Sequence, residues 1–254
     1  MVSILQFVGS GRAFANGKKT LYSMKMKKVL AGFTFLFAAF TSTAQHGQIR
    51  GGINLANVSV TDGGRVDQAN QLTSFQVGVL TDIELGSKSV ALQTGLLYTG
   101  KGSQVQKGTT GQAGYFKQTF NPRYLELPVT FLFKAPISKT GRVFAGAGPY
   151  VAMGVSGRNK TEGTRAILGN YNYQRDITFS NDDPTTFSEE EGAGLGVIRR
   201  FDYGLNGAVG IEGKSLVLGV NYGLGLAKLQ SGTNNNADNN NKHRVLSFTL
   251  GFKF

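Results

Sequence analysis

A strict alternation of apolar and polar residues is the feature that most constrains the fold of this 254-residue chain. From residue 48 onward, apolar side chains recur at every second position, which is the pattern of β-strands with two different faces. In the last segment Leu246, Phe248, Leu250, Phe252 and Phe254 alternate with small or polar residues. The pattern predicts an all-β fold with eight strands, at about residues 48–55, 75–85, 90–99, 125–134, 143–154, 201–212, 215–226 and 243–254.

The connections between these segments alternate in length. Short turns are expected near 86–88, 135–141 and 213–214, whereas the other connections are long and polar, at about 58–73, 101–115, 156–199 and 228–243. Short turns at one end and long loops at the other are typical of outer-membrane barrels. We therefore expect an eight-stranded antiparallel up-and-down transmembrane β-barrel. Its lumen should be filled, because eight strands leave room inside only for side chains.

The N-terminal region predicts export. Three lysines follow Met24, Val29 to Phe40 form an apolar stretch, and Ser42-Thr43-Ala44 supplies the small residues that a signal peptidase needs. The apolar stretch is too short to be a membrane anchor, which needs about 20 residues. We expect residues 1–23 to be an upstream extension outside the fold and residues 24–44 to be a signal peptide cleaved after Ala44. Residues 45–254 would then form the barrel in the outer membrane of a Gram-negative bacterium.

A soluble lipocalin-like carrier of small hydrophobic ligands is the main alternative, because its strands alternate in the same way with the apolar face inward. The polar face of this chain is rich in Gly, which suits a filled interior and would weaken solvent-exposed strands. Aromatic residues also gather near the segment ends, where an outer-membrane barrel has its interfacial girdles. The residues expected in the girdles are Tyr98, Tyr124, Phe133, Phe201, Tyr203, Phe252 and Phe254.

The final segment also predicts how the barrel is assembled. Its aromatic residues at every second position resemble the signal that the outer-membrane assembly machinery reads on its clients. We expect Phe248, Phe252 and Phe254 to form this assembly signal. The expected partners are therefore outer-membrane lipid, the barrel-assembly machinery during biogenesis, and an unidentified partner of the long loops.

The charge of the chain does not indicate a nucleic-acid partner. Of the formal net charge of +12, six positive charges precede residue 45 and the rest are spread along the chain without a basic run. There is no Cys, and the two His residues, His46 and His243, are far apart in sequence. We therefore expect no cofactor, no metal site and no nucleic-acid binding.

The polar faces predict a network of charged side chains inside the barrel. Buried charges are tolerated only when they are paired, so we expect Arg50 to pair with some of the inward carboxylates and plug the lumen, with Lys134 as a second candidate cation. An ion path is disfavoured, because eight strands leave no aqueous channel. The predicted network contains Arg50, Asp82, Glu84, Glu126, Asp202 and Glu212.

No residue is assigned a catalytic role. A lipid-modifying barrel enzyme is a third hypothesis, because His243 and Ser247 share a face of the last strand, but the sequence places no carboxylate beside them. The acidic stretches NDDP (181–184) and SEEE (188–191) are interpreted as a solvated loop, and YNYQRDITF (171–179) alternates as an extension of a strand would. Pro128, inside an expected strand, predicts a local bulge or bend rather than an interrupted strand.

Four stretches resemble the PorT-type family of outer-membrane β-barrel proteins: YLELPVTFLFK (124–134), VFAGAGPYV (143–151), RRFDYGLNGAVGIEG (199–213) and LVLGVNYGLGLAKL (216–229). The resemblance covers about residues 48–254 and implies an eight-stranded barrel. Most members of the family have no known role, and its named member is linked to a secretion and gliding apparatus. The resulting hypothesis is a non-enzymatic membrane scaffold or accessory whose extracellular loops bind a partner, with a link to secretion or surface assembly.

Overall fold

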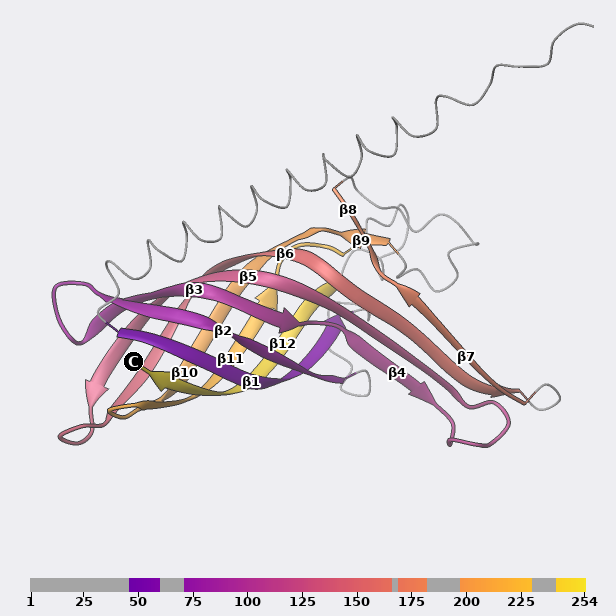
Figure 1. Cartoon of the computed structure of the whole chain (residues 1–254), viewed down its shortest axis with the longest axis horizontal. Helices are drawn as coiled ribbons and strands as arrows, with labels where there is room; N and C mark the ends of the chain where they lie inside the picture. Colours follow the sequence, from indigo (N-terminus) through magenta and orange to yellow (C-terminus); the bar gives the residue numbers. More distant parts are fainter. Residues whose placement is uncertain (1–45, 60–70, 166–168, 182–196, 230–240) are drawn as a thin grey trace, which may run out of the picture. The chain divides into compact units, whose positions relative to one another are not determined.

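The structure, a computed structural model, describes residues 46–59, 71–165, 169–181, 197–229 and 241–254 (Figure 1). The expected upstream extension, the signal peptide and almost all of the acidic stretches lie outside these residues. Gln45–Phe254 forms one compact unit. Within the described ranges there is no helix with the length and apolarity needed to cross a membrane.

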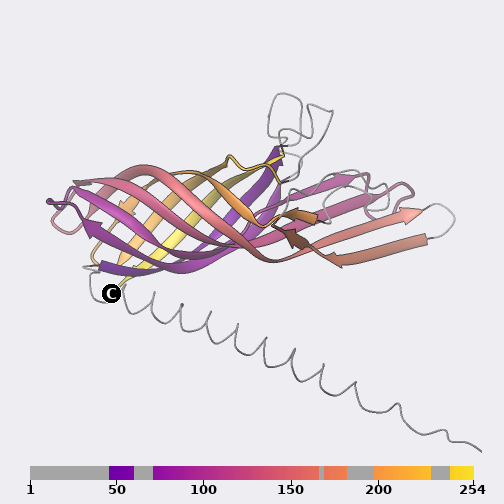
Figure 2. The ribbon, with the colours of Figure 1, turned by 90° about the horizontal axis from the view of Figure 1, so that it is seen from above.

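Eight antiparallel strands close into a barrel, which confirms the predicted fold (Figures 1 and 2). Around the barrel the order is β5-β3-β2-β1-β12-β11-β10-β6, and β5 pairs with β6 to close the cylinder. The first and last barrel strands also pair, over Gln48–Ser59 and Lys242–Lys253. The barrel strands are β1 (His46–Ser59), β2 (Leu72–Glu84), β3 (Val90–Gly100), β5 (Phe116–Pro136), β6 (Arg142–Arg165), β10 (Phe201–Glu212), β11 (Leu216–Gly225) and β12 (Lys242–Lys253).

Two of these strands run far beyond the barrel. β3 ends opposite Arg123 of β5, and β10 begins opposite Met153 of β6, so the distal parts of β5 and β6 continue without these neighbours. There they pair with β4 (Ser103–Lys107) and β7 (Gly169–Asp176). We call this four-stranded extension, residues 103–107, 116–123, 156–165 and 169–176, the blade (Figure 2).

A short parallel pair, β8 (Thr178–Ser180) and β9 (Val197–Arg199), lies in the connection between β7 and β10. The tight connections β2–β3, β5–β6 and β10–β11 lie together at one end, which we call the turn end. The blade lies at the other end, where β1 ends and β12 begins, and we call this the loop end.

The apolar residues of the barrel point outward and the polar residues inward. Ile53 is 57% exposed, whereas its neighbour Asn54 is fully buried. The same contrast recurs around the barrel, with outward Val209, Leu218 and Phe252 about half exposed. This arrangement is the reverse of that in a lipocalin-like carrier, whose apolar face lines the interior.

Of the seven aromatic residues predicted for the girdles, five are exposed, Tyr98 is half-buried and Tyr124 is buried. Phe133, Phe201, Tyr203, Phe252 and Phe254 are exposed on the outer surface. Tyr124 instead has no exposed surface and belongs to a buried cluster at the loop end. The prediction for Tyr124 was wrong because Tyr124 lies two positions before Glu126 in β5, and its side chain therefore points inward like that of Glu126.

The interior of the barrel is packed by large inward side chains that lie against inward glycines of the next strand. A Cβ atom on Gly210, for example, would come within 2.8 Å of the Phe144 ring.

The strand continues through Pro128 as predicted, but the register shows no bulge there. Pro128 pairs with Tyr150 in the register that continues to Pro136, and the shift between β5 and β6 lies at Arg123/Tyr124, where β5 leaves β3.

Candidate functional site: a charged lumen and a polar blade

The turn end of the lumen contains a network of ion pairs centred on Lys134. Its ammonium group donates to Asp82 at 2.6 Å and to Glu212 at 3.0 Å. Glu212 also accepts from Lys253 at 2.6 Å, and Arg142 Nε approaches its other oxygen at 2.6 Å as an ion pair without hydrogen-bond geometry. These groups come from β2, β5, β6, β10 and β12, so the network ties together strands from around the barrel.

A second network, centred on Lys101, lies toward the loop end. The Lys101 ammonium group contacts Glu126 at 2.8 Å and Asp202 at 2.9 Å, and it lies 4.0 Å from the centroid of the Tyr150 ring. Tyr150 donates its hydroxyl hydrogen to Asp202 at 3.0 Å, and Asn206 donates to Glu126 at 2.9 Å. Each of the two carboxylates therefore has a buried cation and a second donor.

Arg50 lies inside the barrel, but in the described structure it does not form the expected ion pair with an inward carboxylate. It is 4% exposed, and its hydrogen bond goes to Gln48 at 3.2 Å; its Nε has no protein partner. The described carboxylates of the lumen instead pair with Lys101 and Lys134. Of the remaining predicted network, Asp82, Glu126, Asp202 and Glu212 are all buried, whereas Glu84 is half-buried near the turn end.

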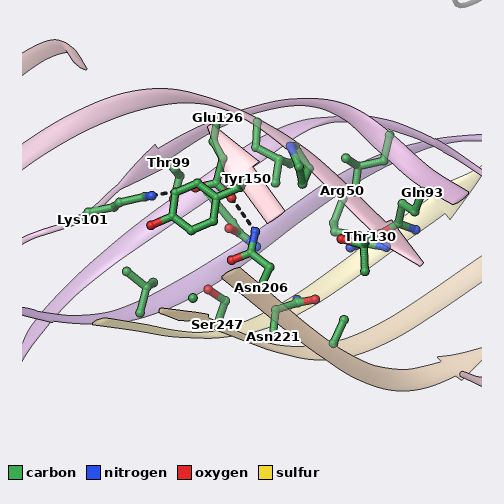
Figure 3. A pocket seen from close by; sticks show the side chains of 17 residues that line it. Arg50, Gln93, Thr99, Lys101, Glu126, Thr130, Tyr150, Asn206, Asn221 and Ser247 are labelled. Carbon is green, nitrogen blue, oxygen red and sulfur yellow. Dashed lines mark hydrogen bonds and ion pairs between the residues drawn. The ribbon is translucent and has the colours of Figure 1, made fainter. Parts of the chain in front are cut away.

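Little space remains between the two networks. The cavity between them offers about 40 Å³ to the centres of water molecules, which is room for a few waters because one needs roughly 10–15 Å³. Figure 3 shows polar side chains from several strands, among them Arg50, Thr130 and Asn221, converging on this space. At this volume the cavity is too small for a hydrophobic ligand.

Apolar side chains close the loop end of the lumen. Ile177 and Ile198, from the connection between β7 and β10, are buried against Tyr124 and Phe120 of β5, together with Leu229. Backbone hydrogen bonds hold this cap in place: Gly154 donates to Arg200, Arg199 to Leu229, and Ile177 to Gly157. The described part of the barrel is thus sealed by ion pairs inside and by a small apolar core above them.

His243 and Ser247 face the lumen and contact different partners. His243 Nε2 lies 3.2 Å from the Tyr124 hydroxyl, whereas Ser247 donates to Asn54 at 2.9 Å. Neither is joined to the other by a hydrogen bond among the described contacts. Over the residues that the structure describes, no group of three or more His, Cys, Asp or Glu could hold a metal ion.

The blade differs from the barrel in that both of its faces are largely polar. Its four segments contain seven cations, Lys107, Lys117, Arg123, Arg158, Lys160, Arg165 and Arg175, against only two carboxylates, Glu162 and Asp176. The edge strand β7 is exposed at seven of its eight positions. An exposed edge with unpaired backbone groups can pair with another chain.

Comparison with known proteins gives one family. The family model described as "Outer membrane protein beta-barrel domain" matches residues 44–231. No curated protein matches the chain. Among solved structures, OprG from Pseudomonas aeruginosa aligns with a TM-score of 0.39 at 14% identity, covering 84% of this chain and 97% of its own.

Two further barrels align in the same range. Ail, the attachment invasion locus protein of Yersinia pestis, solved in complex with the heparin analogue sucrose octasulfate, gives a TM-score of 0.37 at 12% identity, covering 82% of this chain and 98% of its own. The N-terminal β-barrel domain of Pseudomonas aeruginosa OprF gives 0.32 at 8% identity, covering 83% and 99%.

Proposed function

The chain belongs to the outer-membrane protein β-barrel family, and from this premise we propose that it is a non-enzymatic membrane scaffold whose loop-end surface binds a partner. It is an integral protein of the outer membrane of a Gram-negative bacterium. In such barrels the short turns face the periplasm and the long loops face the outside. The blade is then an extracellular structure.

Within the family we propose a PorT-type member with an accessory role in secretion or surface assembly. The stretches that resemble PorT-type proteins fall on barrel strands β5, β6, β10 and β11. This part of the proposal depends on that resemblance, and the blade adds a surface on which an accessory could dock.

The observation that carries the proposal is a sealed lumen beneath a large exposed sheet. Transport through the barrel is disfavoured because two ion-pair networks and an apolar cap fill it. Lipid modification is disfavoured because His243 and Ser247 contact different partners. The blade, by contrast, offers an accessible edge at β7 and a surplus of positive charge.

Site-specific photo-crosslinking in living cells tests the proposal. A photoreactive amino acid replaces Tyr173, which is 59% exposed on β7, and in a matched control it replaces Val209, which is 55% exposed on the apolar surface of β10. We expect a discrete protein adduct from position 173, because edge strands recruit partners by backbone pairing, and no protein adduct from position 209.

The absence of a protein adduct at 173, and at Asn172 on the opposite face of the same strand, would contradict the scaffold proposal. Cells in which residues 104–119 and 160–174 are shortened to tight turns provide a second readout. Their barrel should still assemble, and any surface phenotype of the intact protein should disappear.

A further inference from the structure

A hollow lies on the outer surface where the blade leaves the barrel. It has a volume of about 450 Å³, and its lining includes Asn121, Arg123, Val155, Ser156, Arg158 and Asp176. The hollow arises at the register shift beside Arg123, where Val155 is the extra residue of β6. The same shift separates the apolar barrel exterior from the polar blade.

Two guanidinium groups belong to this hollow. Arg123 is opposite Ser156, and Arg158 is opposite Asn121, so the two arginines are diagonal neighbours on one face of the β5–β6 pair. Diagonal neighbours have Cα atoms about 7–8 Å apart, and an arginine side chain is long enough for both groups to reach one ligand between them.

The two arginines differ in how they are held. Arg123 donates to the Tyr98 hydroxyl at 3.3 Å and lies 5.7 Å from the centroid of the Phe75 ring, so its position is fixed by aromatic residues at the loop end of the apolar surface. Arg158 is exposed, and within the described structure it makes no ion pair or side-chain hydrogen bond. Most of the ten N–H donors of the pair are therefore available to a ligand.

The surface below the hollow is apolar. Val155, which lines it, is 41% exposed, Met153 is 39% exposed, and Phe75 and Val77 are each 45% exposed. In an outer-membrane barrel this outward band contacts lipid chains, and the aromatic residues at its edge lie at the level of the headgroups. The arginines therefore lie at the depth of the lipid phosphates of the outer leaflet.

We propose that Arg123 and Arg158 form a binding site for the phosphate group of an outer-leaflet lipid, with an acyl chain of that lipid lying along Val155 and Met153. Guanidinium groups bind phosphate through paired, charge-assisted hydrogen bonds. Asp176 on β7 is opposite Arg158 and lines the same hollow, so its carboxylate opposes an anionic ligand and limits the affinity.

Lipid binding by the protein purified from membranes in detergent tests the proposal. Native mass spectrometry would compare bisphosphorylated lipid A, the same lipid after removal of its phosphates, and inorganic phosphate. We expect retention of the phosphorylated lipid alone. Each guanidinium should contribute about tenfold in affinity, as charged hydrogen bonds do, so Arg123→Gln with Arg158→Gln should remove most of the binding.

Two matched variants sharpen the test. Lys117→Gln with Arg165→Gln removes two positive charges elsewhere in the blade and should leave binding unchanged, whereas Asp176→Asn should strengthen it. Heat-shifted migration on gels confirms that every variant is folded.

Equal binding of the phosphorylated and dephosphorylated lipids, or undiminished binding by the double Arg variant, would overturn the site. Binding of inorganic phosphate as tight as that of the lipid would overturn the assignment to a lipid. The site is independent of the proposed partner at β7, because the crosslinking result at position 173 does not depend on Arg123 or Arg158.

Discussion

At the scale of single residues, Lys101 is the side chain on which the loop-end network depends. It is the cation shared by Glu126 and Asp202, both buried. Removing one partner of a buried ion pair costs about 3–5 kcal/mol, because the remaining charge is left uncompensated. We expect Lys101→Met to lower the free energy of unfolding by this order, measured as loss of the heat-shifted gel band with urea, since the chain has no Trp to report unfolding.

The exposed Lys107 offers a matched control, and Lys107→Met should behave as the unaltered protein does. Combining Lys101→Met with Glu126→Gln and Asp202→Asn should recover much of the lost stability, because no unpaired charge remains. If Lys101→Met proved as stable as Lys107→Met, the role given to the Lys101 network would be wrong.

At the scale of elements, β12 carries an outward aromatic row that stays a predicted assembly signal. Phe248, Phe252 and Phe254 are 51%, 54% and 75% exposed. We expect Phe252→Ala with Phe254→Ala to reduce the amount of assembled protein in outer-membrane fractions, because the assembly machinery would lose its contact. Leu216→Ala with Leu218→Ala, which removes apolar side chains of similar exposure from β11, should have a smaller effect. Equal losses in the two variants would mean that lipid contact alone explains them.

The strands also show which parts of the fold could be predicted from the sequence. The two-residue alternation of apolar and polar residues located all eight barrel strands, because one face of each strand is apolar and the other face lines a polar lumen. It missed β4, because both faces of the blade are largely polar, which removes the contrast that the pattern depends on. The alternation at 171–179 did indicate a strand extension, and β7 covers most of that stretch. Lys101 was assigned to a loop, although it continues the inward positions of Thr99 and Gln93 by one more step.

The partners in the ion pairs were harder to predict than the face of the strand on which each residue lies. Parity placed Arg50, Asp82 and Glu212 in the lumen, but which cation meets which carboxylate depends on the relative heights of strands across a closed cylinder. The alternation of apolar and polar residues does not give these relative heights. Tyr124 shows the same limit: its inward parity could be read from β5, but the apolar cap that surrounds it comes from distant connections.

At the scale of the whole molecule, the filled lumen predicts an electrically silent barrel. The protein reconstituted in a planar bilayer should give no stable conductance steps, because ion pairs occupy the lumen on both sides of the remaining cavity of about 40 Å³. A preparation heated until its gel shift is lost serves as the control for membrane leakage. Reproducible steps of one size, seen only with folded protein, would show that the lumen opens.

The ion pairs of the lumen also constrain the order in which the barrel can enter the membrane. Lys134 is 52 residues from Asp82 and 78 from Glu212, and Lys101 is 101 residues from Asp202. A hairpin entering the bilayer alone would expose carboxylates to hydrocarbon before their cations arrived, at a high energetic cost. Asp202 meets its cation Lys101 only when strands from both halves of the chain face one another across the cylinder, whereas Glu126 and Glu212 also have cations nearer in the sequence, Lys101 and Lys253. Insertion of these strands and closure of the barrel are therefore expected to be coupled, because a β10–β11 hairpin entering alone would leave Asp202 without Lys101.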